Sequence, residues 1–245
     1  MMLLEARSVT KLFGCLRAVD AVDLTLAAGE VVGLIGPNGA GKSTLVNLIS
    51  GLERPTSGTL VFAGHPLQGE GPAARARQGI ARTFQVPQSF GTMRVRQNVA
   101  VAALFRGQPA ASVPLALREA DEVLEFVGLT AKADAVAETL TTPDLRRLEL
   151  AKALALRPRL LLLDEVMAGL TPAEVNGLIA VVRDVGARGV GVLVIEHVLR
   201  AVMGLCSRIV VLHHGQKIAD GARAEVVANP AVIQAYLGVP YGAAA

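Results

Sequence analysis

The chain has 245 residues, of which 24 are Lys or Arg and 21 are Asp or Glu, so its formal net charge is +3. This length is enough for one α/β domain with a sizeable core, or for two small domains. The basic residues are scattered, aromatic residues make up 3% of the chain and Trp is absent. Such a composition argues against the basic stripes and stacking platforms that bind nucleic acids.

The sequence also limits where the protein can work. No apolar run approaches the ~20 residues of a membrane-spanning helix, so any membrane role must come through a partner. Glu5 and Arg7 interrupt the apolar start, which therefore does not read as a signal peptide. Cys15 and Cys206 lie far apart and match no metal or redox spacing. A reduced, cytoplasmic compartment is the simplest interpretation.

Short apolar runs bounded by turn residues predict buried strands in the first third of the chain. A helix is expected over Lys42–Ser50, because Gly51 ends its apolar periodicity. The strands expected here are Ala18–Leu26, Glu30–Ile35, Thr59–Phe62 and Ile80–Phe84.

From about residue 94 to residue 156 the pattern changes, because apolar residues recur three and four positions apart, which predicts helices. Strands and helices alternate again after this stretch, and His213 and His214 are interpreted as turn residues. The sequence therefore predicts an α/β core interrupted by a helical insert. The later elements expected are strand Leu160–Leu163, helix Pro172–Ala187, strand Val190–Ile195, helix Val198–Leu205, and strands Ile209–Leu212 and Lys217–Asp220.

A glycine-rich loop between a predicted strand and a predicted helix fits the pattern G-x-x-x-x-G-K-[ST]. Glycines let backbone N–H groups close around phosphate oxygens, and the helix start directs its positive end at the anion. Lys42 adds a charge for the β- and γ-phosphates, and Ser43 offers a hydroxyl to Mg²⁺. A chance glycine-rich turn is the alternative. The expected nucleotide contacts are Gly36, Asn38, Gly39, Ala40, Gly41, Lys42, Ser43 and Thr44.

A second element of a phosphate site follows the predicted strand Leu160–Leu163, which ends in Asp164 and Glu165. A buried strand ending in acids brings carboxylates to the sheet edge where α/β folds bind ligands. We expect Asp164 to hold Mg²⁺ through water and Glu165 to polarise the attacking water. The alternative is that the acids only cap the helix that begins at Pro172.

These motifs, in this order, resemble the nucleotide-binding domain of ABC transporters over essentially the whole chain. The resemblance implies ATP and Mg²⁺ as cofactors and a P-loop NTPase (RecA-like) core with an antiparallel β subdomain. It places the core at residues 1–85 and 157–245 and an inserted α-helical subdomain at residues 86–156.

The resemblance also implies roles for single residues. Phe13 would stack on adenine, Gln85 would contact Mg²⁺ and the attacking water, and His197 would touch the γ-phosphate. The residues from Ala168 to Thr171 resemble the family's D-loop. Taken alone, Phe13 could be a core aromatic, Gln85 a surface amide and His197 structural; their order and spacing favour the functional roles.

A narrower resemblance, to the branched-chain amino acid uptake subfamily, is carried by four segments. It implies an importer at the cytoplasmic face of a bacterial inner membrane. The implied partners are a second, different ATPase subunit, two permease subunits and a periplasmic or extracellular solute-binding protein. The segments are Ala81–Gln85, Met167–Pro172, Ile195–His197 and Asn229–Gly238.

One family motif is altered. The signature loop that completes the opposite subunit's ATP site is normally Leu-Ser-Gly-Gly-Gln, and after Leu140 this chain has Thr141, Thr142, Pro143 and Asp144. Pro143 removes a backbone donor, and Asp144 adds an anion where phosphate would lie. Thr142 is also a good N-cap for the helix that follows. We therefore expect an asymmetric pair, in which this chain completes its partner's site poorly.

Two other classes of function compete with a transport ATPase. A soluble ABC ATPase of DNA repair or translation usually carries two ATPase units or large insertions, which this chain lacks. A non-hydrolysing regulatory module is suggested by the altered signature alone. Lys42, Asp164, Glu165 and His197 are all present and argue against it.

Overall fold

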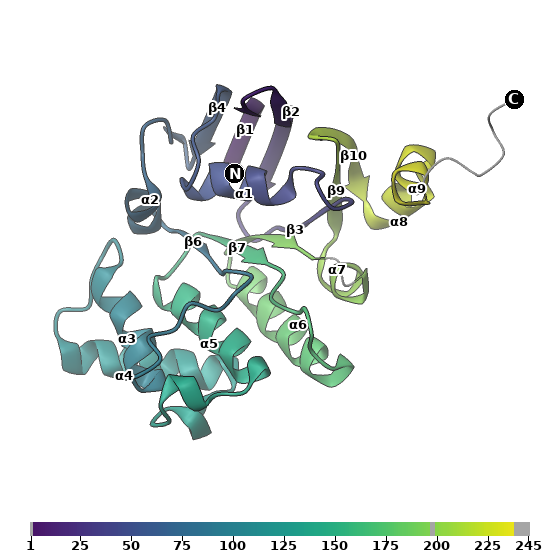
Figure 1. Cartoon of the computed structure of the whole chain (residues 1–245). Coiled ribbons are helices and arrows are strands. Elements are labelled where there is room, and N and C mark those ends of the chain that lie inside the picture. Colours follow the sequence, from purple (N-terminus) through teal and green to yellow (C-terminus); the bar gives the residue numbers. More distant parts are fainter. Residues whose placement is uncertain (1, 197–198, 238–245) are drawn as a thin grey trace, which may run out of the picture.

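The computed structural model describes residues 2–196 and 199–237, which build two sheets and the helices around them (Figure 1). The larger sheet has the strand order β10-β9-β3-β8-β7-β6. Its neighbouring strands are parallel, except that β10 runs antiparallel to β9. The strands are β3 (Val31–Ile35), β6 (Ile80–Arg82), β7 (Leu160–Asp164), β8 (Gly191–Ile195), β9 (Arg208–His213) and β10 (Gln216–Ala222).

The smaller sheet is antiparallel, with the order β2-β1-β4-β5. Sequence analysis found most of β2 but missed β1, because register shifts between Ala6 and Val9 break the two-residue alternation. Ser8 has a positive φ of 46° at this irregularity. The strands are β1 (Met2–Phe13), β2 (Leu16–Ala27), β4 (Ser57–Phe62) and β5 (His65–Pro66).

Strand β3 and helix α1 (Lys42–Ser50) connect the two sheets. Val32 and Leu34 pack into one core, together with the buried side chains of α1 and of the antiparallel sheet. Ile35 packs into the other core, which lies beneath the helices on the opposite face. Because alternate residues of a strand face opposite sides, β3 is covered on both faces and the start of α1 is fixed at its carboxyl end.

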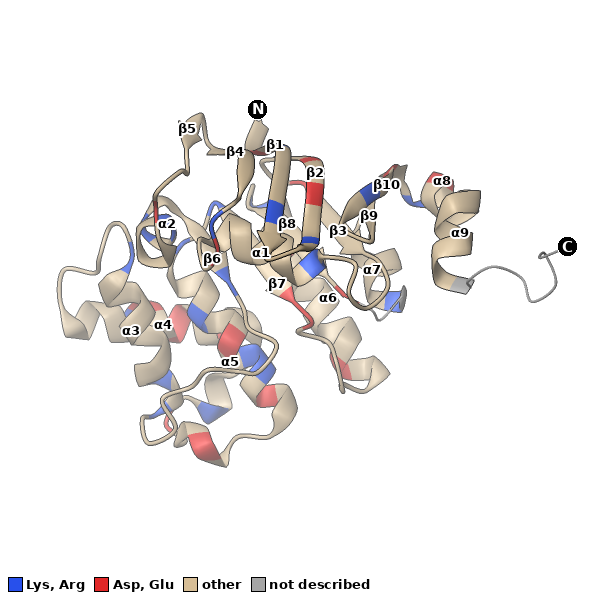
Figure 2. Ribbon diagram, turned by 45° about the horizontal axis from the view of Figure 1, so that its top comes forward, with Lys and Arg blue, Asp and Glu red and all other residues tan. Residues whose placement is uncertain are grey.

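Helices α3 (Val95–Phe105), α4 (Val113–Val127) and α5 (Thr142–Ala155) lie together at one side of the molecule (Figure 1). They confirm the helical character expected for the middle of the chain. Figure 2 shows basic and acidic residues interspersed over them. The remaining helices are α2 (Pro72–Gln78), α6 (Pro172–Ala187), α7 (Leu199–Leu205), α8 (Arg223–Ala228) and α9 (Pro230–Leu237). In the described ranges, no helix combines the length and the apolar character needed to cross a bilayer.

Strand β6 is shorter than the expected Ile80–Phe84 and ends at Arg82. Thr83 still donates its backbone N–H to Leu162 O at 3.0 Å, but Phe84 is 37% exposed and leads away from the sheet. As a strand at the edge of the larger sheet, β6 has one neighbour and can leave after three residues.

The helical region contains a nearly buried ion pair. Arg106 donates from Nη1 to Glu119 Oε2 at 2.6 Å, and their side chains are 6% and 14% exposed. The hydrogen bond from Arg106 holds the pKa of Glu119 below its ordinary value of 4.5, against the opposing effect of burial. Folding therefore gains stability from this carboxylate above that pH, and loses the gain as pH falls through the lowered pKa.

We predict that Glu119→Gln destabilises the protein near neutral pH by about 1–3 kcal/mol, since a charge-assisted hydrogen bond is lost. The difference from the unaltered chain should shrink as pH falls below the ordinary pKa of 4.5, and should vanish below the lowered pKa of the folded state, where the carboxyl group is protonated in both states. Urea unfolding at about pH 7 and about pH 3.5 measures both values. An equal difference at the two pH values would contradict the assignment.

Candidate functional site

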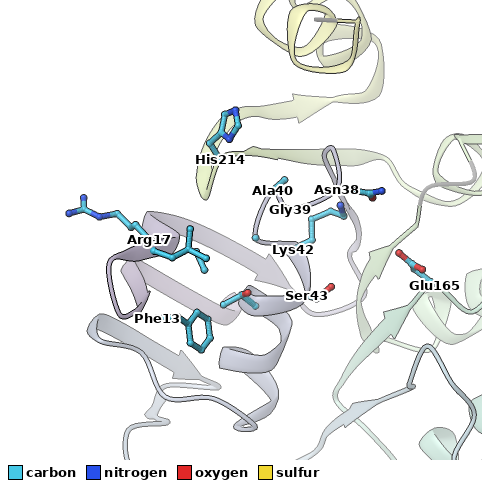
Figure 3. A pocket seen from close by; sticks show the side chains of 13 residues that line it. Phe13, Arg17, Asn38, Gly39, Ala40, Lys42, Ser43, Glu165 and His214 are labelled. Carbon is cyan, nitrogen blue, oxygen red and sulfur yellow. The ribbon is translucent and has the colours of Figure 1, made fainter.

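A pocket of about 460 Å³ opens at the carboxyl end of β3, where open α/β sheets bind their ligands (Figure 3). Four separate segments of the chain build it: the hairpin between β1 and β2, the glycine-rich loop with the start of α1, the turn after β7 and the turn after β9. The lining residues are Phe13, Leu16, Arg17, Ala18, Asn38, Gly39, Ala40, Gly41, Lys42, Ser43, Thr44, Glu165 and His214.

The glycine-rich loop presents its lysine to the middle of this pocket (Figure 3). Lys42 donates from Nζ to Gly36 O at 2.8 Å and to Pro37 O at 2.9 Å. Burial lowers the pKa of Lys42, while the charges of Glu165 and Asp164 act in the opposite direction. The ammonium group is thus held by neutral carbonyls in a partly desolvated loop, where a phosphate anion would be a stronger acceptor.

Two glycines in the loop have positive φ but different surroundings. Gly41 is the N-cap of α1 with φ 98°, and a Cβ there would lie 2.3 Å from Ala18 O. Gly39 has φ 77°, and a Cβ there would meet nothing within 4 Å. Gly41 therefore marks a close approach of the hairpin backbone to the helix start, whereas Gly39 faces open space.

The two acids after β7 lie in different environments. Asp164 is 6% exposed, and its Oδ2 accepts a hydrogen bond from Arg82 Nη2 at 2.7 Å. Glu165 lines the pocket, and its backbone has a positive φ of 51°. Gln85 donates from Nε2 to Glu165 Oε2 at 2.8 Å. The structure thus brings together Gln85 and Glu165, which are far apart in the sequence.

Phe13 is 45% exposed at the end of β1, and Lys11 Nζ lies 4.8 Å from its ring centroid. The interpretation of Phe13 as a core aromatic is therefore wrong. Sequence analysis missed Leu16, Arg17 and Ala18 as part of the pocket, because no motif marks them. It also missed the position of His214, which has φ 47° in the turn after β9 and lines the pocket.

The expected γ-phosphate sensor His197 lies outside the described residues. The residue before it, Glu196, is 2% exposed, and its Oε1 accepts a hydrogen bond from Met167 N–H at 2.8 Å. This contact links the end of β8 to the segment that follows Glu165.

The altered signature forms the start of α5 and does not line the pocket of its own chain. The expectation that Thr142 is the N-cap is wrong by one residue. Thr141 has the extended backbone of an N-cap (φ −71°, ψ 163°), and Thr142 is already helical. Thr141 donates from Oγ1 to Asp144 Oδ2 at 2.8 Å, and Lys132 Nζ lies 3.6 Å from the same oxygen. Asp144 thus engages the Thr141 hydroxyl, and Pro143 has no N–H to offer a phosphate.

The side chains predicted to bind Mg²⁺ are of the right chemical type, but they would need a phosphate to complete the coordination shell. The hydroxyl of Ser43, the carboxylate of Asp164 and the amide of Gln85 are the oxygen ligands that Mg²⁺ prefers. Within residues 2–196 and 199–237, no three His, Cys, Asp or Glu side chains cluster to hold a metal ion. Phosphate oxygens and waters would therefore have to complete the shell.

Comparison with known proteins agrees with this geometry. The family described as ABC transporter matches residues 19–168, and the family described as branched-chain amino acid ATP-binding cassette transporter matches residues 216–241. The chain is 40% identical to the high-affinity branched-chain amino acid transport ATP-binding protein BraF of Pseudomonas aeruginosa, over 96% of this chain and 98% of BraF. It is 37% identical to the lipopolysaccharide export system ATP-binding protein LptB of Acidithiobacillus ferridurans, over 96% and 97%.

Solved structures of similar fold are also known. The crystal structure of the ADP conformation of MJ1267, an ATP-binding cassette of an ABC transporter, superposes with a TM-score of 0.87 at 30% identity, over 98% of this chain and all of that one. The fold and the pocket define a P-loop ATPase. The chain belongs to the ATP-binding cassette family of ABC transporters, with a C-terminal segment of the branched-chain amino acid group.

The two loop glycines give a matched test of the pocket. We predict that Gly41→Ala weakens binding of a fluorescent ATP analogue at least ~10-fold more than Gly39→Ala. Both changes strain a positive φ by ~1–2 kcal/mol, but only the first drives a Cβ into a carbonyl. Fluorescence titration measures the two affinities, and circular dichroism confirms folding. Equal losses would show that the approach of the hairpin at Ala18 does not matter for binding.

Proposed function

We propose that this chain is the ATP-hydrolysing subunit of an importer for branched-chain or related amino acids. The match of residues 216–241 to the branched-chain family carries the substrate part of this proposal. The similarity of the whole chain is less selective, because BraF and the exporter subunit LptB are 40% and 37% identical to it. The solute itself would be selected by the partner subunits.

The proposed chemistry follows from the pocket. The adenine ring would stack on Phe13, and the phosphates would bind the loop N–H groups and Lys42. Ser43, Gln85 and Asp164 would hold Mg²⁺, and the bound ion would supply positive charge against the charge that develops on the phosphates.

Water activation would be the role of Glu165, with its side chain oriented by the hydrogen bond from Gln85. His197 would contact the γ-phosphate. Because Gln85 touches the proposed base and also begins the segment that leads to the helical region, it is well placed to report nucleotide state to a partner.

The proposed partners are a second, different ATPase subunit, two permease subunits and a periplasmic or extracellular solute-binding protein, at the cytoplasmic face of a bacterial inner membrane. We propose that residues 86–156 form the subdomain that meets a permease, with residues 88–105 as the docking surface. Phe90 and Phe105 support this, because they are 50% and 73% exposed. Large exposed apolar side chains favour contact with another protein.

We further propose that the two ATP sites of the assembled pair are unequal. For its own site, this chain would supply the glycine-rich loop, the two acids Asp164 and Glu165, and the amide of Gln85. At the start of α5, however, it offers the partner's nucleotide a proline and an acid whose carboxylate holds Thr141. An anion at this helix end cancels part of the positive end of the dipole that would otherwise attract phosphate.

The function is tested by ATP hydrolysis of the purified chain, alone and with co-expressed partner subunits, beside Glu165→Gln. Loss of the general base should slow turnover ~10²–10⁴-fold. We expect activity with partners and little without them, because this chain lacks an intact signature to complete a second copy of itself. Robust activity of the chain alone, abolished by Glu165→Gln, would contradict the unequal pair but support the ATPase.

Restoring the signature tests the asymmetry directly. We predict that Ser-Gly-Gly-Gln in place of residues 141–144 raises turnover of the assembled complex, because backbone donors return and an anion leaves the helix start. Asp144→Asn alone serves as a control that removes the charge and keeps Pro143. Turnover of the restored complex no higher than that of the parent would refute the prediction.

A further inference from the structure

Arg82, at the end of β6, connects three parts of the proposed site. It donates from Nη2 to Asp164 Oδ2 at 2.7 Å and from Nη1 to Asn47 Oδ1 at 2.6 Å. The Arg82 and Asp164 side chains are 11% and 8% exposed. Asn47 belongs to α1, the helix that starts at the phosphate loop. We propose that Arg82 is a positioning residue that fixes the carboxylate of Asp164 for magnesium; this rests on the proposed metal role of Asp164.

The shape of the guanidinium group is what makes this possible. Its planar fork can meet acceptors on two different elements at once, whereas a lysine ammonium is a point charge on a flexible stem. A carboxylate turns easily about its last side-chain bond, so the orientation of Asp164 has to be imposed from outside. The bond to Arg82 engages Oδ2, and within the described part of the chain Oδ1 has no hydrogen-bond partner. One oxygen is thus held, and the other is left for the water of a metal shell.

The neighbouring residue fixes the backbone of the same acid. Thr83 accepts from Asp164 N–H with Oγ1 at 3.1 Å and donates its own N–H to Leu162 O at 3.0 Å. Arg82, the last residue of β6, and Thr83, which follows it, therefore hold the side chain and the main chain of Asp164.

The same short segment also reaches the second acid. Gln85 follows Arg82 by three residues and donates to Glu165 Oε2 at 2.8 Å. Within residues 82–85, the first side chain thus contacts Asp164 and the last contacts Glu165. An ion pair that served stability alone would not have to involve the acid proposed as the metal ligand.

The test compares nucleotide affinity in saturating Mg²⁺ with affinity in EDTA. The ratio of the two, here called the magnesium enhancement, is measured by titrating the full chain with a fluorescent ATP analogue. Loss of a second-sphere partner typically lowers metal affinity ~10–100-fold, so Arg82→Met should lower the magnesium enhancement about 10-fold or more. Affinity in EDTA should stay within about 2-fold of the unaltered chain. Asn47→Ala should lower the enhancement less, since it removes only the anchor of Arg82.

Three further variants make the result decisive. Arg82→Lys keeps the charge, and a full enhancement in this variant would overturn the role of the fork. Arg106→Met removes a comparably buried ion-paired arginine from the helical region, and should lower the melting temperature but leave the enhancement unchanged. An equal loss of enhancement in Arg106→Met and Arg82→Met would assign the effect to destabilisation and overturn the proposal.

Asp164→Asn separates this inference from the proposed function. If Asp164→Asn loses the enhancement while Arg82→Met retains it, Arg82 is structural only, and the metal role of Asp164 stands. If Asp164→Asn retains the full enhancement, the metal role of Asp164 is wrong, and the inference fails with it.

Discussion

The reversal between β3 and α1 is the constraint on which the site depends. Both elements are buried, so the residues between Ile35 and Lys42 must turn the chain back while leaving their own N–H groups available to a ligand. A side chain at Gly41 would strike the hairpin backbone at Ala18, so the loop can close only with glycine there. The same packing that fixes the loop brings the hairpin of Phe13 beside it, so one constraint builds both the proposed phosphate end and the proposed adenine end of the pocket.

The charged side chains around this loop have different kinds of partner. Lys42 lies within the influence of both acids, and burial opposes its charge. Asp164 is paired with Arg82, and Glu165 is bonded to an uncharged amide. A carboxylate that is paired with a cation is committed to one geometry, which suits a metal ligand. A carboxylate bonded to a neutral amide and facing the pocket is better suited to interact with water, so the different partners of Asp164 and Glu165 favour different roles for them.

Sequence reasoning predicted the elements around the loop because their signals are local. The apolar runs of β3, β7 and β8 and the glycine-lysine motif are contiguous in the chain, and the resemblance added Gln85. It did not predict β1, whose bulges break the alternation, or the place of His214, which depends on how a distant turn folds back. Arg82 was also missed as a participant, although it stands inside a segment that carried the subfamily resemblance. The role proposed for Arg82 rests on its contacts with α1 and β7, which no pattern in a single sequence predicts.

At the start of α5, the residues follow the preferences for the first turn of a helix, but the same residues disfavour phosphate binding there. Pro143 and Asp144 are good first-turn residues, and the structure uses them so, with the cap one residue earlier than expected. Two features stabilise this helix start without a ligand: Asp144 places a negative charge at the positive end of the helix, and Pro143 has no backbone N–H that would need a partner. A helix start built to receive a phosphate needs the opposite, with N–H groups free and no anion of its own. In the proposed pair, this helix start would therefore bind phosphate poorly, and the loss would fall on the opposite subunit rather than on the pocket of this chain.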